Sequence, residues 1–121
     1  MRRKSRLLVL DDDTSMQRLV ATLLRRAGYE VDVVSGGTDA IAQIAKHDYD
    51  GLLLDVMTPT EGAHTVVRHL RETRPELLQR VILVTGSPDS VLKSLAGDVF
   101  EVVHKPFEAA ELLDAVARIK S

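Results

Sequence analysis

The chain has 121 residues, of which 45% are hydrophobic and 28% charged, so its length and composition predict one soluble globular domain over residues 1–121. Its 16 basic and 18 acidic side chains leave a formal net charge of −2, which argues against direct nucleic-acid binding. Without cysteine there is no disulfide or thiolate site, and without a membrane-spanning run or signal-peptide core we expect a cytoplasmic protein.

Short apolar runs alternate with helical periodicity along the chain. The runs predict strands at Arg6 to Leu10, Glu30 to Val34, Gly51 to Leu54, Val81 to Val84 and Phe100 to Val103. Apolar residues spaced three and four apart predict helices around Met16 to Leu24, Ile41 to Ala45, Ala63 to Leu70, Val91 to Leu95 and Leu112 to Ile119. Ala27-Gly28, Pro75 and Ala96-Gly97 are expected to end the first, third and fourth of these helices. Five successive βα units predict an α/β doubly wound fold with a parallel sheet.

Polar residues follow four of the predicted strands. Asp11, Asp12 and Asp13 follow the first strand and Asp55 the third, whereas Thr85 and Lys105 follow the fourth and fifth. Because the carboxyl ends of parallel strands lie at one edge of the sheet, these side chains are expected to meet there.

Several aspartates close together at one edge of the sheet repel one another, so positive charge is needed beside them. Two like charges roughly 4 Å apart repel by about 4 kcal/mol at an effective dielectric of about 20. Mg²⁺ suits an all-oxygen site, and Lys105 supplies a second positive charge. Such a site attracts a phosphoryl group, to which the Thr85 hydroxyl can donate, and a carboxylate there can act as nucleophile and become an acyl phosphate. Asp13 has a competing role as the N-terminal cap of the first helix, so we assign it to the cap and Asp11 and Asp12 to the metal.

Four ordered motifs at these strand ends resemble the receiver domain of bacterial two-component response regulators. The resemblance is carried by Leu7 to Asp13, by Tyr49 to Pro59 around Asp55, by Val84-Thr85-Gly86 and by Lys105-Pro106-Phe107. It covers nearly the whole chain and implies a flavodoxin-like (βα)5 fold with strand order 2-1-3-4-5. Periodicity alone cannot order the strands.

The resemblance also implies roles. Asp55 accepts a phosphoryl group from a phosphohistidine on a sensor histidine kinase or phosphotransfer protein, and the receiver itself catalyses the transfer. Asp12 and Asp55 ligate Mg²⁺, Asp11 reaches it through water, and Met57 offers its backbone carbonyl. Thr85 and Lys105 bind the phosphoryl oxygens, and Gly86 leaves room for the group to approach the backbone. A cis bond before Pro106 is implied as well, although base rates favour trans.

This chain departs from the family pattern in three places. Val102 stands where the family usually has an aromatic switch residue, and the loop after Asp55 is shortened. Fewer residues than usual for the family separate Thr85 from Lys105, which predicts a shortened fourth helix. Because that helix commonly forms part of the partner or dimer surface in the family, the mode of dimerisation and the choice of partner stay open. The chain ends just after the last helix, so we expect a downstream partner protein or an output domain missing from this sequence, with a homodimer as a further possibility.

Other interpretations compete with this one. A degenerate receiver that binds proteins without phosphate is favoured by Val102, whereas retention of the polar strand-end residues argues against it. A phosphatase with an aspartate nucleophile normally carries a second aspartate two residues later, where this chain has Met57. A flavodoxin would need more aromatic residues than the 3% present. The four histidines, which show no metal-ligand spacing, are expected on the surface, and Phe107 is expected to plug the core near the last helix.

Overall fold

The computed structural model describes residues 5–56, 62–86, 97 and 99–119. Its strands are β1 (Arg6–Leu10), β2 (Glu30–Val34), β3 (Gly51–Asp55), β4 (Val81–Thr85) and β5 (Glu101–His104). Its helices are α1 (Thr14–Arg26), α2 (Gly37–Lys46), α3 (Gly62–Thr73), the 3-10 helix η1 (Pro75–Arg80) and α5 (Ala109–Arg118).

All five strands lie parallel in one sheet of order β2-β1-β3-β4-β5, which confirms the predicted α/β flavodoxin-like fold. The predicted strands lie within one residue of the observed ones. Asp55 and Thr85 belong to β3 and β4 as their last residues, and β5 begins and ends one residue later than predicted. The predicted helix from Val91 to Leu95 falls outside the described residues.

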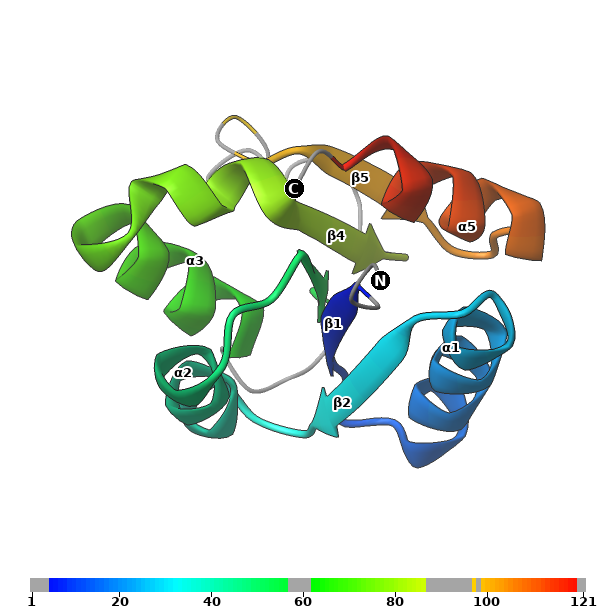
Figure 1. Cartoon of the computed structure of the whole chain (residues 1–121), viewed down its shortest axis with the longest axis horizontal. Coiled ribbons are helices and arrows are strands. Elements are labelled where there is room, and N and C mark those ends of the chain that lie inside the picture. Colours follow the sequence, from blue (N-terminus) through cyan, green and yellow to red (C-terminus); the bar gives the residue numbers. More distant parts are fainter. Residues whose placement is uncertain (1–4, 57–61, 87–96, 98, 120–121) are drawn as a thin grey trace, which may run out of the picture.

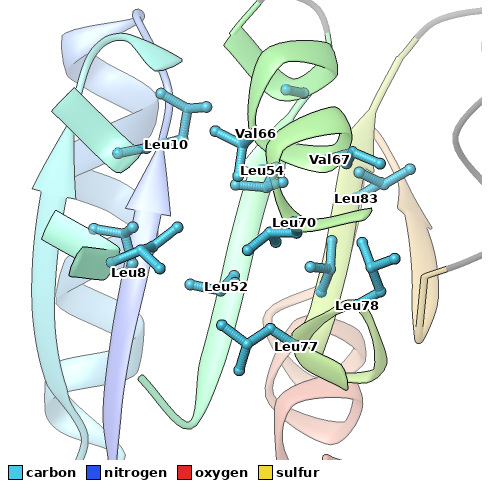
Figure 2. Close-up of a cluster of buried hydrophobic side chains, with 14 of the residues drawn as sticks. Leu8, Leu10, Leu52, Leu54, Val66, Val67, Leu70, Leu77, Leu78 and Leu83 are labelled. Atoms are coloured by element: carbon cyan, nitrogen blue, oxygen red, sulfur yellow. The ribbon is translucent and has the colours of Figure 1, made fainter. Parts of the chain in front are cut away.

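Helices cover both faces of the sheet, with α2 and α3 on one side and α1 and α5 on the other (Figure 1). Alternating side chains of the strands feed two separate cores, because successive residues of a strand point to opposite faces. Figure 2 shows the core on the α3 side, where Leu8, Leu10, Leu52, Leu54 and Leu83 of the strands meet α3 and η1. The other core joins Leu7, Val9, Leu53, Ile82 and Val84 to α1 and α5. Burial on both faces explains why the strands read as continuous apolar runs.

Helix α1 ends where the sequence predicts, and a glycine makes that end possible. Gly28 has φ of +101°, a left-handed conformation that residues with a Cβ adopt at a cost. The Tyr29 N–H donates to the Leu24 carbonyl at 3.1 Å, and the Gly28 N–H donates to the Arg25 carbonyl at 3.0 Å. This pair of bonds is a Schellman motif, which turns the chain directly into β2.

Pro75 follows the end of α3 as predicted, because it cannot continue the helix. It begins η1, which the periodicity did not predict. Six residues are too few to show a helical repeat, and the adjacent Leu77 and Leu78 are both buried against the core.

Strand β2 forms one edge of the sheet, and helix α1 partly covers that edge. The peptide groups of Glu30 and Val34 face β1, so those of Val31 and Val33 face away from it. The guanidinium of Arg25 donates to the Val31 carbonyl at 2.9 Å, while the Val33 side chain is 40% exposed.

Within the described residues, no helix has the length and apolar character of a membrane span.

Candidate functional site

The carboxyl edge of the sheet brings three aspartates together. Leu10 of β1 lies beside Leu54 of β3, so Asp11, directly after β1, and Asp55, the last residue of β3, lie at the same level of the sheet. Carboxylate oxygens of Asp11, Asp12 and Asp55 all lie within 4.8 Å of one another. Asp11 and Asp55 are each only 3% exposed, whereas Asp12 is open to solvent.

The proximity of these groups perturbs the protonation of Asp11. Its burial raises its pKa to about 6, and the neighbouring Asp55 carboxyl adds to the increase. The backbone N–H of Asp13 donates to Asp11 Oδ1 at 2.9 Å and opposes that shift, as does the charge of Lys105. The site therefore favours a proton or another positive charge between Asp11 and Asp55.

Asp13 lies outside this carboxylate group and caps α1, as predicted. Its Oδ1 accepts the backbone N–H groups of Ser15 at 2.9 Å and Met16 at 3.3 Å. These bonds satisfy two of the N–H groups that the first turn of a helix leaves free.

Thr85, the last residue of β4, and Lys105, the residue after β5, lie at the same edge of the sheet. The Lys105 ammonium lies 3.3 Å from Asp55 Oδ1, and the Lys105 side chain is 19% exposed, whereas that of Asp55 is 4% exposed. The Lys105 backbone N–H donates to the Thr85 carbonyl at 2.6 Å, which joins the two strand ends. The peptide bond between Lys105 and Pro106 is cis, as the resemblance implies. Thr85 is fully buried and the following Gly86 is exposed.

The donor set fits a small divalent cation. It consists of carboxylate oxygens, which are the ligands that Mg²⁺ prefers, and exposed Asp12 leaves the group open to water on one side. Burial and the neighbouring Asp55 carboxyl raise the pKa of Asp11, and a cation bound between the carboxylates would oppose this increase. Met57, the fourth metal residue predicted from the sequence, lies outside the described residues.

The histidines are not part of this group. His104 is exposed, as expected, and His47, His64 and His69 are half-buried, so these three are less exposed than predicted. The ring of His47, for example, contacts Tyr49 edge-on at a centroid distance of 6.1 Å, which accounts for part of its burial. Phe107 is half-buried and packs, as predicted, against the core that includes residues of α5.

A family model described as the response regulator receiver domain matches residues 7–117, nearly the whole chain. The chain belongs to the response regulator receiver family. The response regulator MprA of Mycobacterium avium (strain 104) is 37% identical to this receiver domain over 111 residues, which are 89% of this chain and 47% of MprA. The DNA-binding transcriptional regulator NtrC of Rhizobium meliloti (strain 1021) is 29% identical over 112 residues, 93% of this chain and 23% of NtrC. The receiver domain thus spans half or less of the length of these relatives.

Solved receiver structures share the fold. The response regulator protein TrrA from Thermotoga maritima, solved in complex with Mg²⁺-BeF, is 27% identical with a TM-score of 0.82, covering 96% of this chain and 99% of TrrA. A signal receiver domain from Bermanella marisrubri has a TM-score of 0.87 at 24% identity, covering 97% of this chain and 98% of that one, and shows the fold alone.

Proposed function

We propose that this receiver domain accepts a phosphoryl group on Asp55 in a Mg²⁺-dependent reaction and thereby switches its partner-binding surface. The observation that carries the proposal is the convergence of Asp11, Asp12 and Asp55 within 4.8 Å, with the Lys105 ammonium 3.3 Å from Asp55. The donor is expected to be a phosphohistidine on a sensor histidine kinase or a phosphotransfer protein.

Each of the three aspartates would have its own role in binding Mg²⁺. Asp12 and Asp55 would hold Mg²⁺ directly, Asp11 would reach it through water, and the Met57 carbonyl would complete the protein ligands. When bound, Mg²⁺ offsets the negative charge of the carboxylates and of the phosphoryl oxygens. The carboxylates then no longer repel the incoming group.

The transfer itself is a substitution at phosphorus. An oxygen of Asp55 forms a bond to phosphorus while the bond from phosphorus to the donor imidazole nitrogen breaks, and the electron pair returns to the imidazole. Lys105 and the Thr85 hydroxyl donate to the phosphoryl oxygens, where negative charge is concentrated. Exposed Gly86, which lacks a Cβ, leaves space beside them. Attack of water on the acyl phosphate later returns Asp55 to its carboxylate.

The signal is expected to leave the domain through protein contacts. MprA and NtrC are longer than this chain, so the receiver would act on a downstream protein or on an output domain of a longer protein, in the cytoplasm. We also propose that residues 1–121 form a single domain that does not itself bind nucleic acid and that can form a homodimer.

Intact-mass measurement tests the phosphoacceptor. Incubation with acetyl phosphate and Mg²⁺ should add one phosphoryl group to the wild-type chain and none to Asp55→Asn, because the amide cannot form an acyl phosphate. Asp114→Asn, which changes an exposed carboxylate of α5, should be labelled like the wild type. Labelling that persists in Asp55→Asn would refute the assignment.

One observation favours a second function. Val102 is half-buried against the core on the α3 side and has no polar group that could exchange partners on phosphorylation. A receiver that binds its partner equally well with and without phosphate would fit this feature. Partner affinity of the phosphorylated chain and of Asp55→Asn would then be the same.

A further inference from the structure

Gln17 of α1 reaches two strand ends beside the aspartate cluster. Its Nε2 lies within hydrogen-bond distance of three acceptors, so its two N–H groups are shared among them: the backbone carbonyl of Asp11, that of Val34 at 3.3 Å and the hydroxyl of Ser35 at 3.0 Å. One half-buried side chain thus joins the end of β1 to the end of β2.

The bond to Asp11 acts on a particular peptide group. The Asp11 carbonyl belongs to the same rigid plane as the Asp12 N–H and Cα, so fixing this carbonyl fixes where the Asp12 Cα lies. The bond from the Asp13 N–H to Asp11 Oδ1 restrains the next peptide group, and the two restraints together set the direction of the Asp12 side chain. On the other side of Asp11, its N–H donates to the Val34 carbonyl at 3.1 Å. Gln17 and β2 therefore hold both peptide groups of Asp11.

Asp12 depends on this restraint more than its neighbours do. Asp11 accepts the Asp13 N–H, Asp13 accepts two N–H groups of α1, and Asp55 contacts Lys105. Within the part of the chain that the structure describes, no hydrogen bond or ion pair holds the Asp12 carboxylate. Its position next to Asp11 and Asp55 follows from its backbone.

We propose that Gln17 is a positioning residue for the metal-binding half of the site. Through the Asp11 carbonyl it orients the 11–12 peptide group and so holds the Asp12 carboxylate near Asp55. The inference rests on the proposed function, because it assigns Asp12 as a direct Mg²⁺ ligand. Removal of the donor should lower Mg²⁺ affinity even while the fold is intact.

A matched control lies on the same helix. Arg25, two turns further along α1, donates to the Val31 carbonyl of β2 and makes no contact with the aspartates. If Gln17 only fastens α1 to the sheet, Arg25→Met should affect the site as much as Gln17→Met does. If Gln17 positions Asp12, only Gln17→Met should.

The test measures Mg²⁺ binding by calorimetry on the full chain, at a temperature where circular dichroism shows every variant folded. Loss of a residue that orients a metal ligand without binding the metal itself typically lowers metal affinity by about 10- to 100-fold. Gln17→Met should therefore weaken Mg²⁺ binding by at least about tenfold. Arg25→Met should bind Mg²⁺ like the wild type. Gln17→Asn, which keeps the amide but is one methylene shorter, should behave like Gln17→Met and replaces it if the methionine variant does not fold.

A metal-free measurement adds a second readout. The amide NMR signal of Asp12 should shift in Gln17→Met without Mg²⁺ and stay in place in Arg25→Met. Wild-type Mg²⁺ affinity in both Gln17 variants, or equal losses in Gln17→Met and Arg25→Met, would overturn the positioning role and leave the proposed function standing. A wild-type chain that binds no Mg²⁺ would overturn the proposed function itself.

Discussion

Three consecutive aspartates show how the environment separates chemically identical side chains. Asp11 is buried next to Asp55, Asp12 is exposed and shares the carboxylate cluster, and Asp13 turns away to cap α1. The backbone conformation at the end of β1 makes this division. Only the first two can contribute oxygen atoms to a cation held by Asp55.

Substitution of the neighbouring aspartates should separate metal binding from stability. Asp12→Ala should strongly weaken Mg²⁺ binding, because it removes an oxygen ligand. Asp13→Ala should keep most of the Mg²⁺ affinity but lower the free energy of unfolding by about 1 kcal/mol, the usual cost of a lost N-terminal cap. Calorimetric titration and urea unfolding of both variants measure the two effects. Equal loss of Mg²⁺ affinity in both would contradict the division.

At the scale of elements, the ends of β4 and β5 are coupled but differ in chemistry. Thr85 pairs with His104 in the sheet register, and its carbonyl accepts the Lys105 N–H. Val102 lies two residues before His104 on the same strand and contributes only apolar contacts. Any conformational response to a phosphoryl group should therefore begin at the hydroxyl of Thr85.

Phosphorylation is expected to change the backbone around Thr85 and Gly86 more than it changes Val102. Thr85 gains a charge-assisted bond only in the phosphorylated state, and a ligand shifts an equilibrium only by its differential interaction with the two states. Val102 has a branched side chain with few rotamers and no polar group. Amide and methyl NMR shifts with and without beryllofluoride would measure this. Large changes centred on Val102, with Thr85 and Gly86 unmoved, would contradict it.

The sequence predicted most elements because their signals are local. The strands are runs of apolar residues buried on both faces, and helix ends coincide with Gly28 and Pro75. The 3-10 helix η1 was not predicted, because six residues are too few to show a repeating pattern of apolar residues. Strand order came from the resemblance to receivers, since the pairing of β1 with β3 joins residues more than 40 positions apart.

The candidate site was predictable only in part. Each proposed site residue follows or ends a strand, so its location could be inferred from the apolar run before it. Gln17 gave no comparable signal, because a glutamine in an amphipathic helix is usually a solvated residue. Only the folded arrangement places its amide against the carbonyls of Asp11 and Val34.

At the scale of the whole molecule, Asp11 should make stability depend on pH. Burial raises its pKa from the ordinary 3.8 to about 6, so the folded, metal-free chain binds an extra proton between these values. The resulting stabilisation is fully present below the unfolded pKa and is lost as pH rises through about 6. Mg²⁺ affinity should change in the opposite sense and fall as pH drops below about 6, because protons compete for the carboxylates.

Urea unfolding of the metal-free wild type and of Asp11→Asn between pH 4 and 7 tests whether the free energy of unfolding decreases with rising pH because of Asp11. The wild type should lose stability relative to the variant as pH rises across this interval, since the asparagine cannot ionise. A difference between the two proteins that stays constant with pH would show that Asp11 does not titrate in this way.

The bond from Arg25 to the Val31 carbonyl has a consequence for behaviour at high concentration. An open sheet edge offers its outward carbonyl and N–H groups to strands of other molecules, which is a common start of aggregation. Here one outward acceptor of β2 is already occupied by a bulky cation, which repels a like-charged copy approaching edge to edge. Arg25→Met would leave the signalling site untouched but expose this acceptor. We therefore expect Arg25 to protect the receiver from intermolecular strand pairing, a role separate from its part in the fold.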